Sequence, residues 1–323
     1  SPLGAPISAL DFARADAKTL AAAAAAAEAA ASAALADPAA DPAADPAEDS
    51  AEDFDFVSEP AGGGGDATLL GVGFGAAPFG WAVLRVAAAG GAATATATEV
   101  VRRDGRARVT ALRFAPSGAW LAVGSADAQI ALVDAAAGWV EVARCAGHSS
   151  AITQLDWTDD GYVLRSNCLG HELRFWDVDP DELRASATGE QITLASACRD
   201  LRWASFGVTL GWHCQGIYAS AADGTGVHGV DRSDDGALLA TADAYGQVNL
   251  LRYPCVARPP RGGPPNRRSF GAHASAALGC RWVGGGSGGD RLVSIGGLDL
   301  CVLQWRRVPA ISPPQSGHQL RSR

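Results

Sequence analysis

The sequence predicts an all-β fold of the propeller type, in which small antiparallel sheets repeat around an axis. A short alternating segment recurs five times, each copy is followed by a turn and further apolar runs, and glycine and proline are frequent, with 39 and 17 residues among 323. Alternation of apolar residues with polar or small ones is the period of a strand. Repeated units of this size bury their faces only against one another.

The recurring segment ends in Phe or Trp after a charged residue in four of its five copies, and we expect each copy to be the first strand of a unit. The copies are "ISALDF" (7–12), "VTALRF" (109–114), "ITQLDW" (152–157), "VHGVDR" (227–232) and "ALGCRW" (277–282).

A second and a third apolar run follow each copy, and weaker fourth segments such as "WVEVARC" (139–145) come after them. The second runs are "LLGVGF" (69–74), "LAVGSA" (121–126), "VLRSNC" (163–168), "LLATAD" (238–243) and "LVSIGG" (292–297); the third are "WAVLRV" (81–86), "QIALVD" (129–134), "ELRFWD" (172–177), "QVNLLR" (247–252) and "CVLQWR" (301–306). Intervening turns such as "TDDG" and "SDDG" suit tight hairpins. Three or four short strands per unit, repeated radially, predict a β-propeller.

One unit carries Gly-His at 147–148, before its first strand, and Trp-Asp at 176–177, at the end of its third. These two pairs mark the WD40 repeat. The step of 43 residues from the preceding first strand agrees with a blade of about 40–45 residues. Steps of 102, 75 and 50 residues elsewhere predict insertions.

The largest insertion, residues 13–66, divides the first blade, so residues 1–12 supply that blade's first strand and residues 67–308 the remaining propeller. The insertion begins with an alanine-rich stretch of high helix propensity and continues as an acidic, proline-punctuated tract that we expect to be disordered. Residues 1–66 hold 13 acidic and 2 basic side chains, whereas the rest holds 22 and 24. The propeller is therefore near neutral, which disfavours a nucleic-acid binder. Residues 309–323 are expected to form a disordered tail.

A second insertion, about residues 199–225, contains "RDLRWASFGVTLGWHCQGIYAS". It is too apolar for a solvated loop, and we expect it to pack on the propeller as extra strands.

In a WD40 blade, a loop His, a Ser or Thr on the second strand, a turn Asp and a Trp on the third strand form a buried hydrogen-bonded chain. Two blades offer such sets: His148, Ser166 and Trp176 in the third, with Gly170 where the Asp should stand, and His273, Ser294, Asp299 and Trp305 in the last. Other blades keep only Ser125 with Asp127, or Thr241 with Asp243. A catalytic Ser/His/Asp interpretation is disfavoured because the spacing follows blade architecture.

Other chemical motifs are weak, and we predict no catalytic residue, no cofactor and no metal ligand set. "GVGFGA" (71–76) fits a dinucleotide fingerprint on paper, but "APFGWAVLRV" follows it, so a hairpin is favoured over the helix that the motif requires. Seven cysteines are spread without a CxxC pair, as expected of free thiols in a reducing compartment. The only long apolar run is polyalanine, too weakly hydrophobic to anchor in a membrane.

The stretch "ARPPRGGPPNRRSF" (257–270) is a Pro/Gly-rich basic loop between the third and fourth strands of a blade. Its arginines, Arg258, Arg261, Arg267 and Arg268, form either a solvated loop or a contact for an acidic protein surface. Because no aromatic platform is interleaved, single-stranded nucleic acid is the least favoured partner.

The order of "LAVGSADAQIALVD", "CAGHSSAITQLDW", "CRDLRWASFGVTLGW", "LLATADAYGQVNLLRYPC" and "LVSIGGLDLCVLQWR" resembles the C-terminal propeller of the echinoderm microtubule-associated protein-like family. The resemblance covers about residues 66–308 and the first dozen. It implies a non-enzymatic WD40 scaffold that associates with tubulin or microtubules in the cytoplasm and cytoskeleton, including cilia. Gly170 and Arg281, each in place of an Asp, depart from the family pattern, as does the long arginine loop.

The alternative to a microtubule scaffold is a general WD40 adaptor in a signalling or ubiquitin-ligase assembly. Five blades are visible in a chain that starts at a first strand and contains no Met, so we expect them to be an incomplete part of a larger propeller.

Overall fold

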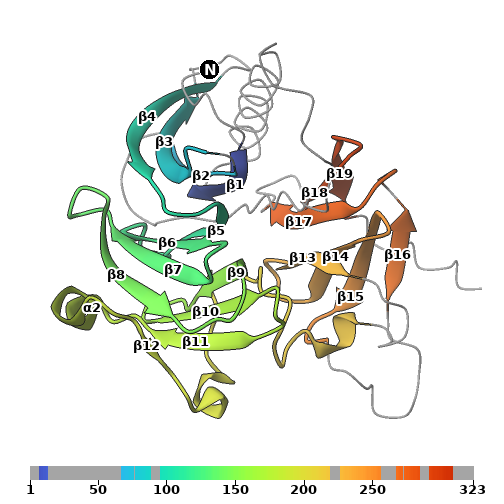
Figure 1. Ribbon diagram of the computed structural model, residues 1–323. Coiled ribbons are helices and arrows are strands. Elements are labelled where there is room, and N and C mark those ends of the chain that lie inside the picture. Colours follow the sequence, from blue (N-terminus) through green and yellow to red (C-terminus); the bar gives the residue numbers. More distant parts are fainter. Residues whose placement is uncertain are drawn as a thin grey trace, which may run out of the picture.

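The computed structural model in Figure 1 is an all-β propeller of five sheets. It describes residues 7–13, 67–75, 77–88, 95–218, 226–255, 267–271, 273–283 and 291–307. The expected helical and disordered parts of the 13–66 insertion, and the tail 309–323, lie outside the described residues.

Each sheet is one blade, and we number the blades I to V in chain order. Blade I contains β1 (Ile7–Ala13), β2 (Ala67–Phe74), β3 (Gly80–Ala88) and β4 (Ala95–Asp104); blade II contains β5 (Val109–Phe114), β6 (Trp120–Ser125), β7 (Gln129–Asp134) and β8 (Val140–Ala146). Blade III contains β9 (Ile152–Trp157), β10 (Val163–Cys168), β11 (Leu173–Asp177) and the short β12 (Glu190–Gln191).

The last two blades differ in strand number. Blade IV contains β13 (Val227–Arg232), β14 (Leu238–Asp243), β15 (Gln247–Arg252) and β16 (Arg268–Gly271). Blade V has three strands in the described part of the chain, β17 (Ala277–Val283), β18 (Arg291–Gly296) and β19 (Val302–Arg306). All neighbouring strands within a blade pair antiparallel.

The five repeated segments are the inner strands β1, β5, β9, β13 and β17, as the sequence pattern predicts. Alternating apolar residues on these strands fill the cores between blades. Trp81 and Phe114 share the core of blades I and II, Ile152 and Leu132 that of II and III, and Trp282 lies between IV and V. "GVGFGA" leads from β2 toward β3, which begins at Gly80, so the hairpin is confirmed over the dinucleotide interpretation.

One helix and one insertion differ from the sequence prediction. Helix α2 (Pro180–Ser186) separates β11 from β12; Asp179 caps it by accepting from two backbone N–H groups, and Leu183 is buried in the core of blades II and III. The prediction of extra strands within 199–225 is wrong for residues 199–218. There the chain forms irregular backbone and the 3-10 turn η2 (Gln215–Ile217), with a single bridge from Trp203 to Thr158.

A second 3-10 turn, η1 (Ala195–Cys198), leads into this segment. The segment 199–218 lies between blades III and IV. Trp203 and Phe206 pack with Phe175 of blade III, and Cys214 and Ile217 pack with blade IV. Two of its backbone N–H groups, those of Gly207 and Val208, donate to a buried side chain rather than to a strand neighbour.

We expect Ile152→Ala to lower the free energy of unfolding by about 2–5 kcal/mol, because the side chain is fully buried between blades II and III and its loss leaves a cavity. Equilibrium urea unfolding measures this. Val140→Ala, at an apolar position that is 47% exposed, is the matched control. Equal losses in the two variants would contradict the assigned core.

Candidate functional site

The polar set of blade III forms a continuous chain of hydrogen bonds. His148 Nε2 lies 2.6 Å from Ser166 Oγ, and Trp176 Nε1 donates to the same oxygen at 2.8 Å. His148 Nδ1 lies 3.3 Å from Glu172 Oε2. With Nδ1–H donating to the carboxylate, Nε2 accepts the Ser166 hydroxyl proton, and that oxygen accepts from the indole. Every proton then has one acceptor, which requires a neutral histidine.

Gly170 stands at the turn position where an Asp was expected, but blade III still has an acid in its network, because Glu172 supplies the carboxylate two residues later. Its Oε2 also accepts from the backbone N–H of Ser149 at 3.1 Å and from Arg174 Nε at 3.3 Å. The hydrogen bond from Arg174, followed by that from Ser149, lowers the pKa of Glu172 to about 2. Burial lowers the pKa of His148, which favours the neutral ring.

Blade V repeats this arrangement with all four predicted residues. His273 lies between Asp299, at 3.1 Å from Nδ1, and Ser294, at 2.9 Å from Nε2, and Trp305 Nε1 donates to Ser294 Oγ at 3.0 Å. Asp299 also accepts from the backbone N–H groups of Ala274 and Cys301. Although burial opposes it, this set of donors holds the pKa of Asp299 below its ordinary value.

Both hydroxyls are shielded from solvent: Ser166 and Ser294 are 0% and 1% exposed. Each is fixed between a histidine and an indole, so neither can reach a substrate without breaking the network. The geometry therefore suits a rigid blade rather than acyl transfer. His148, Cys168 and Glu172 also place one potential metal-ligand atom each within 4.8 Å of one another. Both ring nitrogens of His148 already have protein partners, so we assign this group to the blade network.

Blades II and IV hold shorter versions. In blade II the Ser125 hydroxyl donates to Asp127, which also accepts from the backbone of Gln129. In blade IV the Asn249 side chain donates to Asp243 at 2.9 Å and lies 3.3 Å from the Thr241 hydroxyl.

The arginine loop is only partly within the described residues: Arg258 and Arg261 lie outside them. Arg267 is half-buried against blade IV, where its Nε donates to Asn249 Oδ1 at 3.0 Å and its guanidinium lies 3.7 Å from Asp243. Arg268 begins β16 and is exposed. The structure thus separates the two, since Arg267 is engaged within the blade and Arg268 faces solvent.

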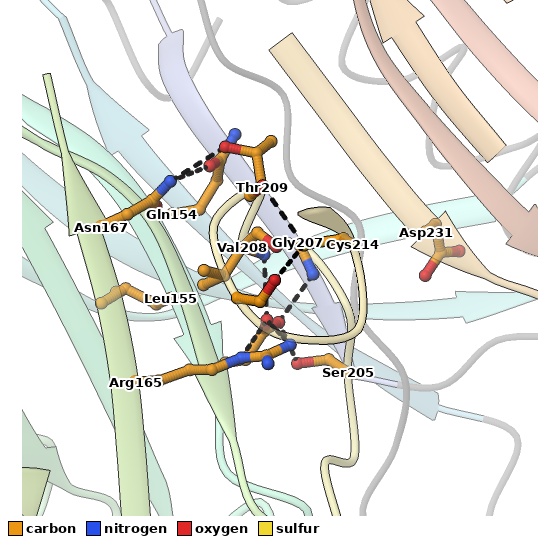
Figure 2. Close-up of polar contacts among 12 residues, drawn as sticks. Gln154, Leu155, Arg165, Asn167, Ser205, Gly207, Val208, Thr209, Cys214 and Asp231 are labelled. Carbon is orange, nitrogen blue, oxygen red and sulfur yellow. Dashed lines mark hydrogen bonds and ion pairs between the residues drawn. The ribbon is translucent and has the colours of Figure 1, made fainter. Parts of the chain in front are cut away.

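A second polar cluster, which the sequence analysis missed, lies between blades III and IV (Figure 2). At its centre is Asp156, which is fully buried on β9. Its carboxylate accepts from Arg165 at 2.8 and 3.0 Å, from the Ser205 hydroxyl at 2.6 Å, and from the backbone N–H groups of Gly207 and Val208 at 2.8 and 2.9 Å. One carboxylate thus binds three donors of the segment 199–218 to blade III.

These donors outweigh the burial that opposes ionisation. Arg165 and Arg113, then Ser205 and Gly207, hold the pKa of Asp156 below its ordinary value, so the carboxylate is ionised. Arg113 comes from blade II, and its Nε donates to the Leu155 carbonyl of blade III at 2.8 Å. A Cβ at Gly207 would lie 2.5 Å from the Arg113 guanidinium, so a side chain here would force that guanidinium to move.

Aromatic rings and guanidinium groups alternate along the same segment. Arg165 lies over Trp203 at 4.3 Å and Phe206 at 5.2 Å, and Arg232 of blade IV lies over Phe206 at 4.0 Å and Tyr253 at 5.3 Å. Such cation–π contacts are strongest away from water. The stack extends from blade III across the segment to blade IV.

The equivalent residue of blade IV, Asp231, has a different environment and lies apart from this cluster in Figure 2. It accepts from the backbone N–H of Trp282 at 2.6 Å, and Arg281 of blade V lies 3.4 Å away. Burial dominates here and raises the pKa of Asp231 to about 6. Arg281, which departs from the family pattern, thus faces the carboxylate of the preceding blade.

Aligned by register, the fifth residues of the repeated segment are Asp11, Arg113, Asp156, Asp231 and Arg281. The signs alternate between neighbouring blades except from III to IV, where two aspartates follow each other. The segment 199–218 enters between these two blades and supplies donors to the first aspartate. The repeated sequence pattern contained this signal in its charged fifth position.

The cysteines offer little nucleophilic chemistry. Five of the seven are buried. Burial raises the pKa of Cys145 to about 12 and that of Cys214 to about 11, so both remain thiols near neutral pH.

Replacing Ser166 with Ala leaves the Trp176 indole N–H without its buried acceptor and His148 Nε2 without its donor. We expect the free energy of unfolding to fall by about 1–3 kcal/mol. Chemical denaturation of wild type and variant measures the difference. Ser196→Ala, which removes an exposed hydroxyl outside the network, is the control. A Ser166→Ala variant as stable as this control would argue against the network.

Asp156→Asn and Asp231→Asn form a matched pair at equivalent positions of blades III and IV. We expect Asp156→Asn to cost about 3–5 kcal/mol of unfolding free energy, because an amide cannot satisfy the charged and backbone donors around it. Asp231→Asn should cost much less, since a neutral side chain suits its site. Equal losses measured by urea unfolding at pH 7 would contradict the assigned difference.

The same pair predicts opposite pH behaviour. The raised pKa of Asp231 means that its protonated form stabilises the fold below its unfolded pKa of about 4, and that this contribution is lost as pH rises through about 6. Asp231→Asn should therefore reduce the fall in stability between pH 4 and 6. The lowered pKa of Asp156 makes its contribution present above pH 4 and lost on further acidification.

Comparison with known proteins gives the family. A family model described as "Echinoderm microtubule-associated protein second beta-propeller" matches residues 77–307. Human echinoderm microtubule-associated protein-like 2 is 37% identical over 211 residues, which is 64% of this chain and 30% of that protein. The 77 kDa echinoderm microtubule-associated protein of Strongylocentrotus purpuratus is 36% identical over 208 residues, 64% and 28% of the two chains.

Human echinoderm microtubule-associated protein-like 3 is 32% identical over 231 residues, covering 66% of this chain and 24% of its own length. The match to the β-propeller domain of Myceliophteria thermophila Cps50 (Swd1) covers 74% of this chain and 67% of that domain, with a TM-score of 0.40 and 13% identity. The chain spans at most about 30% of the length of the relatives described above. With residues 77–307 matched and the propeller built as described, the chain belongs to the family of the second β-propeller of echinoderm microtubule-associated proteins.

Proposed function

We propose that this chain is a non-enzymatic propeller scaffold that associates with tubulin or microtubules. The observation that carries the proposal is family membership, because its relatives are named as microtubule-associated proteins. The site geometry supports a scaffold, since both His–Ser pairs are committed to buried networks inside blades. We propose that the chain acts at the cytoskeleton, in the cytoplasm. The names of the relatives described above do not mention a cilium.

A surface rather than a cavity is the expected means of binding. Arg268 is exposed on the outer strand of blade IV, and Arg258 and Arg261 precede it in the same basic stretch. Arg267 is excluded from the contact because it is engaged with Asn249 and Asp243. We propose that the three remaining arginines contact the acidic surface of tubulin.

In the described part of the chain, no helix has the length and hydropathy that crossing a bilayer requires.

Microtubule co-sedimentation of the purified, folded chain tests the proposal. We expect pelleting that weakens from low to physiological salt, because exposed charge pairs are screened over about 8–10 Å. Replacing Arg258, Arg261 and Arg268 with Ser should weaken binding about tenfold. The control replaces three exposed arginines elsewhere on the propeller, Arg85, Arg199 and Arg202.

Equal loss in both triple variants would contradict the assigned contact while leaving microtubule association intact. A folded chain that stays in the supernatant at low salt would remove the microtubule proposal and favour the general adaptor.

A further inference from the structure

Ser269 is an exposed hydroxyl whose partner in the structure is a guanidinium. It lies on β16, the outer strand of blade IV, and every residue of that strand is exposed. The Ser269 hydroxyl oxygen accepts a hydrogen bond from Arg267 Nε at 3.3 Å. A positive charge therefore already faces the oxygen to which a modifying group would be attached.

Hydroxyls in the tight turns of three other blade positions have acidic partners instead. Each donates to an aspartate two residues further on: Ser125 to Asp127, Thr158 to Asp160 and Ser233 to Asp235. A phosphate on any of these three hydroxyls would meet a like charge, whereas on Ser269 it would meet an opposite one. Of these four hydroxyls, Ser269 is the one whose surroundings favour an added phosphate.

The residues around Ser269 suit an enzyme that recognises arginine. Arg267 and Arg268 occupy the two positions before it, and Phe270 follows it. Kinases select their substrates partly by such charge patterns. The segment is already extended, and it pairs with β15 along one edge over only four residue pairs. Few ladder hydrogen bonds must therefore open for the segment to enter a kinase.

We propose that Ser269 is phosphorylated by an arginine-directed serine/threonine kinase, and that the phosphate then binds Arg267. In the reaction the γ-phosphoryl group of ATP passes to Ser269 Oγ. The phosphorus–Oγ bond forms, the bond to the departing ADP breaks, and the hydroxyl proton goes to the base of the kinase. Side chains two positions apart on a strand share a face, so the phosphate lies on the face of Arg267. A guanidinium binds phosphate through two parallel N–H bonds.

The phosphate competes with the present partners of Arg267. Arg267 Nε donates to Asn249 Oδ1 at 3.0 Å, and its Nη2 lies 3.7 Å from Asp243 Oδ2. Asp243 also accepts from the backbone N–H groups of Tyr245 and Gln247 and from the Asn249 amide. Blade IV can therefore release Arg267 without leaving its buried carboxylate unpaired.

The consequence for partners rests on the proposed function. Arg267 and Arg268 carry two positive charges, and a phosphoserine adds about −1.5 to −2 at pH 7. The net charge of residues 267–269 then falls close to zero. Arg268, next to the phosphate, attracts an acidic surface less, so the phosphorylated chain should pellet less with microtubules at low salt.

The site is tested by treating the purified full chain with ATP and the catalytic subunit of cyclic-AMP-dependent protein kinase. Peptide mapping by mass spectrometry should find the phosphate on Ser269, and Ser269→Ala should remove it. Arg268→Gln should slow incorporation about tenfold, because a recognised charge is lost. Arg252→Gln, at an exposed arginine of the neighbouring strand β15, is the matched control. Ser196 is exposed but follows "TLA", without an arginine, and should stay unmodified.

Phosphorus-31 NMR of the phosphorylated chain tests the pair with Arg267 without microtubules. A neighbouring guanidinium favours the doubly charged phosphate, so the second pKa of the phosphate should lie below its ordinary value of about 6. Arg267→Gln should raise that pKa back toward the ordinary value. Arg252→Gln should leave it low.

Each part of the proposal has a result that would overturn it. No phosphate on Ser269, or equal modification of Ser196, would overturn the site. A phosphate pKa that Arg267→Gln leaves unchanged would overturn the pairing. Equal pelleting of the two forms with microtubules would overturn the consequence for partners. Failure of the unmodified chain to pellet would instead overturn the proposed function, and the mapping and NMR results would still decide the site.

Discussion

The carboxylate of Asp156 holds the segment 199–218 in place, and that segment determines how blades III and IV meet. The direct link between their inner strands is a hydrogen bond from Gln154 Nε2 to His228 O at 2.7 Å. The remaining connection passes through Ser205, Gly207 and Val208, and then through the rings of the same segment. An ionised, fully buried carboxylate is tolerated only when its donors are fixed. The segment and the carboxylate therefore require each other.

This arrangement also resolves an electrostatic conflict between neighbouring blades. Opposite charges meet where Arg113 of blade II lies near Asp156 and where Asp231 of blade IV faces Arg281. Between blades III and IV, by contrast, the aligned charged position is an aspartate in both blades, Asp156 and Asp231. The segment separates them, and Arg165 and Arg232 add positive charge on either side of Phe206. The result is one ionised aspartate and one whose pKa is raised, in equivalent positions of adjacent blades.

The distribution of polar groups explains why the propeller suits a scaffold. The His–Ser–Trp sets and the Asp156 cluster are directed inward, where they stabilise blades and blade contacts. Features available to other molecules are carried by exposed residues such as Arg268 and Leu300. A rigid body whose His–Ser–Trp sets and Asp156 cluster are committed to structure presents a constant surface to partners.

The strands, their grouping into blades and the residues of the His–Ser–Trp sets could be predicted from the sequence alone. These depend on alternation, turn residues and spacings within one blade, such as the 18 residues between His148 and Ser166. Glu172 was missed because the turn of blade III brings an acid from two residues beyond the expected position. The conformation of residues 199–218 and the separate roles of Arg267 and Arg268 depend on contacts between elements that are far apart in the sequence. The contacts of Asp156 join residues 49 to 52 positions apart on different elements, and no local periodicity encodes such a meeting.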